Sequence, residues 1–448
     1  LLLFLAMLTA MLCQLVRGYF ALEPGLYLQT LFTILLPEYA LLALLAIAVQ
    51  ALCSRKYLGY AVFVAIGVAS FALRGRGFDH PLLHYAAFPE LDYSNMNGYG
   101  HHLLRERMLA LYWGGAALML LVLTVVLWPR GVNAELKSRL RMARRNLTLP
   151  ALGAFGAGLL VFGATGALLW YELDVAGNYR SAHAEELRRA DYETRYRRFA
   201  QLPQPRVTNV DLQVDLHPRS RVLAVQGHYQ LQNQTGAALS DLILYQQPGV
   251  DLVTRLSQPA RLVSADRKRG FFHYRLATPL APQARIALAF DLSAAPGGLL
   301  GIGSDTPVAA NGSFFTHEAL PRIGYQNAVE LTDTRDRRRH GLARRAPQPA
   351  APIERIAFSA IVSTTPDQVA VAPGTLEREW IAQERRYFHY RSEGAVPNEY
   401  AIASARYAVR NERWQDVAID AYFDPAHADN AQRLVRGAGP VLDYGPRQ

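Results

Sequence analysis

The sequence has almost no cysteine. Only Cys13 and Cys53 occur among the 448 residues, and both lie in apolar stretches. The polar part of the chain therefore has no disulfide and no thiol site. Because that part is long enough to bury a hydrophobic core without covalent cross-links, the lack of cysteine excludes no cellular compartment.

Complete catalytic motifs are also absent from the sequence. His317 and Glu318 begin like the zinc motif H-E-x-x-H, but no second histidine follows at the required spacing. There is no Walker A loop, no G-x-S-x-G elbow and no paired-cysteine metal site. The sequence alone therefore identifies no catalytic residue and no set of metal ligands.

Charge is missing from one long stretch, LTLPALGAFGAGLLVFGATGALLWY, which is residues 147–171. A transmembrane helix needs about 20 apolar residues, so this stretch is long enough to cross a bilayer. No later stretch is. We therefore predict a membrane region, a polar stalk, a β-rich domain and the beginning of a further domain, at residues 1–171, 172–205, 206–424 and 425–448.

Five apolar stretches occur in the membrane region, at residues 1–16, 28–52, 57–73, 108–128 and 147–171. The first is short for a span, and the chain begins with Leu rather than Met. We expect that stretch to be a truncated span and the chain to be part of a longer protein that continues beyond both ends.

Basic residues are concentrated in two connections, 54–56 and 129–146. Loops rich in Lys and Arg usually face the cytoplasm, which predicts that the residues after Tyr171 lie outside it. The same bias accounts for much of the formal net charge of +10. We therefore expect a lipid bilayer, and no nucleic acid, as a partner.

Glu38 follows Pro37 inside the second apolar stretch. A carboxylate at that depth is costly unless it faces the helix bundle or a wet cavity, which makes Glu38 a candidate functional residue. The alternative is that the span begins later and that Glu38 lies near the membrane surface beside a proline kink.

Small residues in the fifth stretch have the spacing of helix-packing motifs. The candidates are Gly153, Ala154, Ala157 and Gly158. Such residues let helix backbones approach closely, which predicts that the spans form a bundle. The alternative is that these residues are simply common in membrane helices.

Two other polar segments have competing interpretations. His80 and His84 would share one face of a helix and permit a metal site, but an ordinary folded loop explains them as well. The basic segment 335–345, RDRRRHGLARR, permits a nucleic-acid or lipid-headgroup patch. Because prolines follow it at once, we expect a solvated surface loop.

The polar half changes its periodicity at residue 207. Residues 185–199 predict a helical stalk, whereas VTNVDLQVDLHP (207–218) and RVLAVQGHYQLQN (221–233) alternate apolar and polar residues as strands do. Roughly ten such strands predict an antiparallel β-sandwich or saddle-like sheet. The expected fold is thus an α-helical membrane bundle followed by an all-β domain, with a helical pattern returning at residues 427–444.

Several segments of the polar half resemble a known family in the same order. Residues 192–235, which contain Pro218 and Gly227, resemble the start of the N-terminal β-domain of aminopeptidase-N-type zinc metallopeptidases, the gluzincins. Residues 396–411 and 414–444 resemble its junction with the catalytic domain. The membrane half, through DYSNMNGYG (92–100), resembles bacterial ABC-exporter-type permeases fused to such a peptidase.

This resemblance implies a multi-pass protein of the bacterial inner membrane with its β-domain in the periplasm. It also implies a partner ABC ATPase, a peptide substrate, and zinc in a catalytic domain beyond residue 448, so that no cofactor is expected in this chain. The alternative is a non-catalytic permease subunit whose β-domain binds cargo or a partner.

Overall fold

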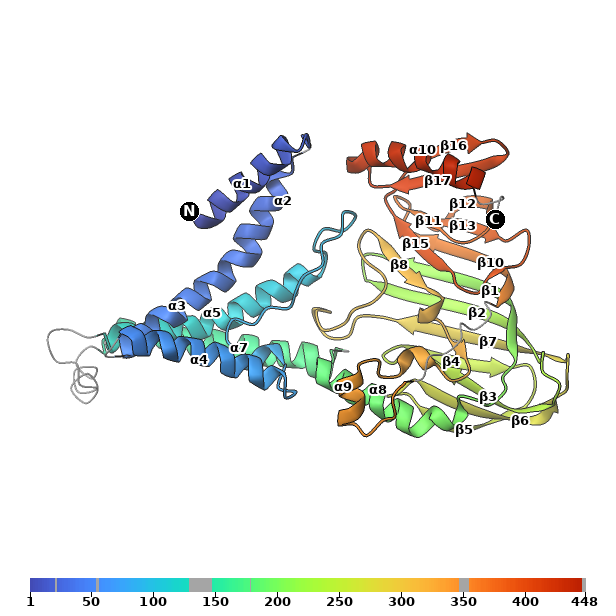
Figure 1. Cartoon of the computed structure of the whole chain (residues 1–448), viewed down its shortest axis with the longest axis horizontal. Coiled ribbons are helices and arrows are strands. Elements are labelled where there is room, and N and C mark those ends of the chain that lie inside the picture. The colour runs from blue at the N-terminus through green and yellow to red at the C-terminus, as the bar shows by residue number, and fades with distance from the viewer. Residues whose placement is uncertain (21, 54–55, 129–146, 178, 346–353, 445–448) are drawn as a thin grey trace. The chain divides into compact units, whose positions relative to one another are not determined.

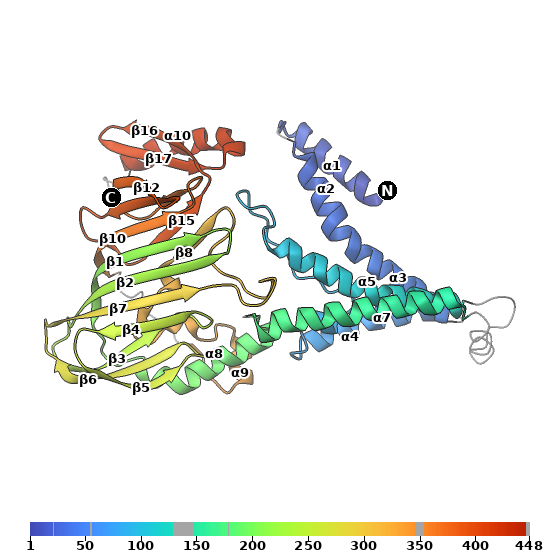
Figure 2. The same ribbon diagram turned by 180° about the vertical axis from the view of Figure 1, so that it is seen from behind.

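The computed structural model describes the chain except residues 21, 54–55, 129–146, 178, 346–353 and 445–448 (Figures 1 and 2). The basic segment 129–146, on which the predicted orientation depends, therefore lies outside the described residues. The chain divides into a helical unit (Leu1–Leu91, His101–Ala184 and Gly297–Gly303) and a β-unit (Asp92–Gly100, Glu185–Pro296 and Ser304–Gln448).

The apolar stretches form helices, as predicted. In the described residues, four helices are long and apolar enough to cross a membrane: Pro24–Leu52, Tyr57–Arg74, His102–Val126 and Leu149–Val175. The count differs from the expected five because the first stretch forms a helix, Leu2–Val16, of only 15 residues. At about 1.5 Å per residue it is shorter than the ~30 Å hydrocarbon core.

The elements of the helical unit follow in chain order. They are α1 (Leu2–Val16), α2 (Pro24–Leu28), a π-helical segment (Gln29–Leu35), α3 (Leu36–Leu52), α4 (Lys56–Arg74), α5 (His102–Val126), α7 (Leu149–Trp170) and a second π-helical segment (Tyr171–Val175).

A compact apolar cluster holds the helical unit together. Tyr112 and Trp113 of α5 contact Phe162 of α7, with the Tyr112 and Phe162 rings stacked at 4.4 Å between centroids. Leu41 of α3 and Leu169 of α7 belong to the same buried cluster. The segment between α4 and α5 joins it through Tyr85, whose hydroxyl donates to the Leu41 carbonyl at 3.1 Å.

The main part of the β-unit follows α8, most of which belongs to it, and consists mostly of strands. Its elements are α8 (Ala182–Tyr196), β1 (Arg206–His217), β2 (Val222–Gln232), β3 (Leu239–Tyr245), β4 (Asp251–Leu256), β5 (Ala260–Asp266), β6 (Phe271–Leu280), β7 (Arg285–Ala294), β8 (Ser313–Thr316), β9 (Arg322–Ile323), α9 (Thr334–Arg339), β10 (Arg355–Thr364), β11 (Val369–Val371), β12 (Thr375–Ala382), β13 (Arg385–Arg391), β14 (Val396–Pro397), β15 (Ala401–Ala405), β16 (Ala408–Trp414), β17 (Val417–Phe423) and α10 (Ala428–Tyr444).

The largest sheet has the strand order β12-β13-β10-β1-β2-β7-β4, with β14 added beside β10. Smaller sheets have the orders β5-β6-β3-β9, β11-β15-β8 and β16-β17. Buried residues alternate along β1, β2 and β7, which places one face of each strand on a shared apolar core.

The prediction of a mostly β domain is confirmed, but that of a purely antiparallel one is wrong. β1 pairs in parallel with β10, with Asn209 opposite Ala357 and Asp215 opposite Ser363, while β1 and β2 are antiparallel. Alternation in a sequence shows which side chains are buried, but it does not show which strand lies alongside or in which direction that strand runs.

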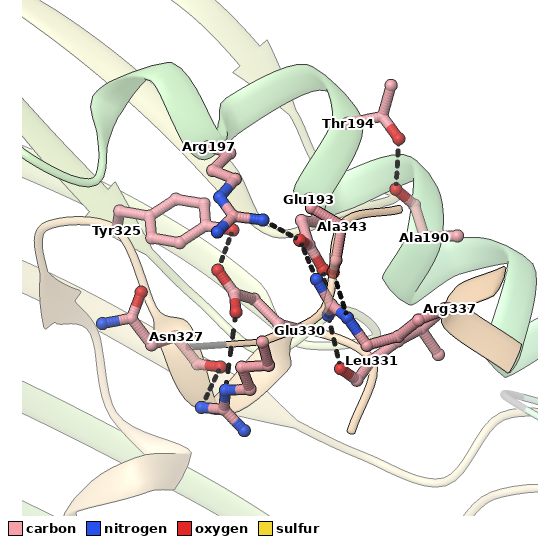
Figure 3. A network of polar contacts seen from close by, with 11 residues as sticks. Ala190, Glu193, Thr194, Arg197, Tyr325, Asn327, Glu330, Leu331, Arg337 and Ala343 are labelled. Carbon is pink, nitrogen blue, oxygen red and sulfur yellow. Dashed lines mark hydrogen bonds and ion pairs between the residues drawn. The ribbon is translucent and has the colours of Figure 1, made fainter. Parts of the chain in front are cut away.

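The prediction of a solvated loop at residues 335–345 is wrong for part of the segment, although most of its side chains are exposed or partly exposed. Part of that segment forms the short helix α9, whose Arg337 is only 2% exposed. Its guanidinium donates to both carboxylate oxygens of the fully buried Glu193 on α8, at 2.7 and 2.8 Å, and to the carbonyl oxygens of Leu331 and Ala343 (Figure 3). A buried ion pair therefore holds α8 to α9 within the β-unit.

Candidate functional site

The β-unit contains a polar cavity of about 440 Å³ near the start of β1. The short strand β9 and the residues that directly follow β14 complete its wall. The lining residues are Gln204, Pro205, Arg206, Val207, Tyr229, His317, Pro321, Arg322, Ile323, Gln326, Glu354, Asn398, Glu399 and Tyr400.

Glu354 is the partly buried acid of this cavity. Its Oε2 accepts a hydrogen bond from the Asn398 amide at 3.4 Å, and its Oε1 lies 4.0 Å from Nε of Arg206. Burial raises the pKa of Glu354 above its ordinary value, and Asn398 and Arg206 offset only part of that effect. Glu354 therefore holds a proton more readily than an exposed glutamate does.

His317 provides a second titratable group. Its backbone amide donates to the Tyr400 carbonyl at 2.9 Å, which connects the end of β8 to β15. Burial lowers the pKa of the His317 imidazole, and the positive charge of Arg322 acts in the same direction. The imidazole is thus kept neutral at a pH where an exposed histidine would already be partly protonated.

Two buried tyrosines form the floor of the cavity. Tyr229 and Tyr400 are hydrogen-bonded to each other, and burial raises the pKa of both hydroxyls well above the ordinary value. Neutral hydroxyls, a partly buried acid, a neutral imidazole and two arginines together suit a polar ligand that carries both a positive and a negative group. They do not assemble a nucleophile with an adjacent base.

The histidines of the segment before α5 are engaged in local contacts. Nδ1 of His84 lies 2.8 Å from the Ser70 hydroxyl, and its Nε2 faces the Phe78 carbonyl oxygen. Nε2 of His80 lies 3.1 Å from Asp174. Taken separately, neither unit brings three potential metal ligands together among the described residues. An ordinary folded segment therefore accounts for His80 and His84.

Glu38 lies in the first turn of α3 and is partly exposed, directly after the π-helical segment that ends at Leu35. It interacts electrostatically with Arg74 of α4 and with Glu106 of α5. Pro37 at the start of α3 agrees with the kinked alternative, because an inserted turn and a proline both bend a helix. Whether Glu38 has a function stays a prediction.

Glu106 was not identified from the sequence. It is 3% exposed, and its Oε2 has no hydrogen-bond partner among the described residues. The predicted fourth span began at Met108, whereas α5 begins at His102 and includes Glu106. The helix was predicted to begin later because the residues before Met108, HHLLRER (101–107), are mostly polar. Leu103 and Leu104 among them nevertheless continue the apolar pattern of the span.

The four small residues of α7 have different surroundings. A Cβ atom added at Gly158 would lie 2.9 Å from the Gly115 carbonyl oxygen of α5, so the two backbones approach closely there. Gly153 has no described atom within 4 Å of such a Cβ, Ala157 is exposed and Ala154 is partly buried. Gly115 of α5 is the facing residue, and it belongs to the run of small residues at 114–117 in that helix.

No protein-family model and no curated protein matches the chain. Among solved structures it resembles the M1 zinc metallopeptidase from Deinococcus radiodurans, with 15% identity and a TM-score of 0.33 over 49% of this chain and 47% of that one. A mutant of that enzyme bound to a Tyr-Ser-Ala substrate has 14% identity and a TM-score of 0.33, over 51% of this chain and 52% of that one. These similarities are weak, and the chain spans about half the length of the structures it matches.

Proposed function

We propose that this chain is the membrane-anchored, non-catalytic front part of a zinc metallopeptidase-like protein. The observation that carries the proposal is the close succession of α7 and α8. α7 is an apolar helix long enough to cross a membrane, and Glu193 of α8 is bonded to the buried Arg337 of the β-unit. This succession supports a β-domain that follows directly in the chain after a membrane-spanning helix.

The peptidase part of the proposal is supported by the sequence resemblance at residues 192–235, 396–411 and 414–444. The zinc and its ligands would then belong to a following catalytic domain. The test is to purify the protein encoded by the complete reading frame, and to measure its zinc content and its hydrolysis of aminoacyl-coumarin substrates. Stoichiometric zinc and chelator-sensitive hydrolysis are expected, with neither in residues 1–448 alone. A complete protein without zinc or hydrolysis would overturn this part.

The location proposed is the bacterial inner membrane, with the β-unit in the periplasm. It is supported by the four long apolar helices and by the basic composition of residues 129–146. Alkaline phosphatase and green fluorescent protein fused after Ser181 test the orientation. Phosphatase activity without fluorescence is expected there, and the reverse after Glu135. A fluorescent fusion after Ser181 would contradict the orientation.

We further propose that the helices belong to an ABC-type permease that requires an ATPase partner. Glu38 and Glu106 support this, because carboxylates within membrane-type helices usually serve a transport or coupling role. In a reconstituted export assay, Glu38→Gln and Glu106→Gln are expected to slow ATP-dependent export, while Glu90→Gln in an exposed loop position serves as the control. Unchanged export in both variants would weaken the permease assignment.

A second candidate function is that of a binding module, and the β-unit cavity favours it. The combination of Glu354, Arg206 and Arg322 suits a short peptide with a free amino group and a free carboxylate. We expect fluorescent short peptides to bind residues 1–448 without any further domain. Binding should be weaker after Glu354→Gln, whereas Glu379→Gln on the outer strand β12 should not change it. Failure to bind would leave only the first candidate.

A further inference from the structure

The end of α7 contains a glutamate in an unusual environment. Glu172 follows Tyr171 immediately after α7 and is completely buried. Its Oε1 accepts hydrogen bonds from the backbone amides of Leu299 and Leu300, at 2.6 and 3.0 Å. These leucines lie in the tip loop, here residues 297–303 (GGLLGIG), which connects β7 to β8 along the chain but belongs to the helical unit.

Glycines allow this close approach. A Cβ atom at Gly298 would overlap the Glu172 carboxylate, and one at Gly303 would overlap the Glu172 carbonyl oxygen. Gly298 also has φ of +87°, a backbone conformation that favours glycine. Ile302 of the same loop is buried in the apolar cluster that contains Leu169. One side of the tip loop is therefore fixed to the end of α7 by hydrogen bonds, close backbone contact and apolar burial.

The other side of the tip loop is apolar and uncovered in the helical unit. The Leu299 side chain is 79% exposed, and Leu300 is also exposed. Trp170, Tyr171 and Val175 at the end of α7 are likewise exposed, so the surface of the loop continues the outer apolar surface of that helix. A single exposed leucine is ordinary on a soluble protein, but a continuous apolar surface on a membrane-type helix is a lipid-facing surface.

The length of α7 sets the depth of this surface. Its 22 residues, Leu149–Trp170, rise about 1.5 Å each, which gives about 33 Å and matches the ~30 Å hydrocarbon core. Residues 171–175 then lie at headgroup depth, where Trp and Tyr are enriched. Because Glu172 bonds directly to the tip loop, the loop lies at the same depth.

We propose that the tip loop is a membrane-interface anchor in which Leu299 and Leu300 insert among the lipid headgroups and upper acyl chains beside the end of α7. The proposal rests on the membrane location proposed above, but it requires neither peptidase nor permease activity. Its occupant is lipid rather than a second protein, because the surface continues that of a helix whose outer face is apolar along its length.

The test uses the full chain in lipid nanodiscs, with Cys13→Ala and Cys53→Ala as background. A nitroxide spin label is attached in turn at Leu299→Cys, at Leu160→Cys on the exposed face of α7, and at Val263→Cys on the exposed face of β5. Collision with oxygen, which concentrates in lipid, is compared with collision with a water-soluble nickel chelate. We expect the ratio of oxygen to nickel collisions at residue 299 to exceed that at 263 severalfold, approaching that at 160.

Three outcomes would overturn the proposal. A ratio at residue 299 equal to that at 263 would mean that the loop is in water. If collisions with both oxygen and the nickel chelate at residue 299 decrease as the number of chains per disc rises, protein rather than lipid covers the loop. A ratio at 160 equal to that at 263 would show instead that α7 is not in lipid, which would refute the proposed membrane location. Glu172→Leu removes the acceptor and should shift the ratio at 299, but not at 160, toward the value at 263. An unchanged ratio at 299 would overturn the role of Glu172.

Discussion

Gly227 of β2 lies directly opposite Phe290 of β7, and the Phe290 ring occupies the space above the glycine where a side chain would stand. The two residues form one cross-strand pair in the largest sheet. The ring also makes an edge contact with Tyr229, at 4.9 Å between centroids. Glycine normally weakens a strand, but here its missing side chain makes room for an aromatic residue of the main core.

Gly227→Ala is therefore expected to destabilise the β-unit. The added methyl group would force the Phe290 ring to move in a closely packed core, which typically costs about 1–3 kcal/mol. Thermal unfolding of the detergent-solubilised chain, followed by the β-sheet circular-dichroism signal, should show a lower Tm. Gly236→Ala is the matched control, since no described atom lies within 4 Å of a Cβ there. Equal Tm values for the two variants would contradict the steric role of Gly227.

Substitution of Arg337 tests the buried ion pair with Glu193. Arg337→Met leaves the Glu193 carboxylate buried with Arg197 as its remaining partner, and breaking such a pair typically costs about 3–5 kcal/mol. The same unfolding measurement should show a large loss of stability. The exposed neighbour Arg338→Met should change the unfolding free energy by no more than about 0.5 kcal/mol.

The double variant Glu193→Leu/Arg337→Met separates the cost of an unpaired charge from the value of the pair. Because it leaves no buried charge unpaired between these two positions, it should be more stable than Arg337→Met alone. If the double variant loses as much stability as the two single variants added together, the coupling between Glu193 and Arg337 is absent.

The sequence predicts local structure well but not these long-range contacts. The apolar stretch 57–73 corresponds closely to α4, and the alternating stretches 207–218 and 221–233 correspond to β1 and β2. Periodicity could not predict that β1 pairs in parallel with β10. More than a hundred residues separate the two strands, and pairing depends on the whole core.

The same limit applies to the charged residues. Arg337 lies in a run of arginines whose sequence is that of an ordinary solvated loop. Its burial depends on Glu193, which is more than a hundred residues away in the chain. Glu106 and Glu172 were not predicted to be buried, because Glu106 lies just before one apolar stretch and Glu172 just after another. In such positions the sequence does not show where the helix begins or which chain segment covers the carboxylate.

The lowered pKa of Glu185 leads us to expect a loss of stability at acid pH. Its burial would by itself raise the pKa, but hydrogen bonds from Arg188 and Arg189 outweigh that effect and hold the pKa at about 2. A group with a lowered pKa in the folded state stabilises the protein above its unfolded pKa, here about 4.5. That stabilisation decreases as the pH falls through the folded pKa.

The unfolding free energy of the wild-type chain should therefore fall between about pH 5 and pH 2 more steeply than that of Glu185→Gln, which lacks this titration. Chemical denaturation at several pH values in that range measures the difference. Glu384→Gln, in the exposed turn between β12 and β13, controls for a general change in charge. A Glu185→Gln curve parallel to that of the wild type would show that Glu185 has no lowered pKa.

The contact between α5 and α7 depends on Gly115 and Gly158, which lie against each other's helix. A Cβ atom at Gly115 would lie 2.7 Å from the Phe162 amide nitrogen and 2.9 Å from the Gly158 carbonyl oxygen. These are backbone atoms, so the helices themselves would have to separate. Gly115→Ala and Gly158→Ala are expected to lower the Tm of the helical signal by several degrees in nanodiscs.

Gly153→Ala tests whether every small residue of α7 has this role. Because nothing described lies within 4 Å of its Cβ position and alanine favours a helix over glycine by up to about 1 kcal/mol, this variant should keep or raise the Tm. If Gly153→Ala lowers the Tm as much as Gly158→Ala does, another surface packs against the Gly153 side of α7. The four small residues would then form one continuous packing face.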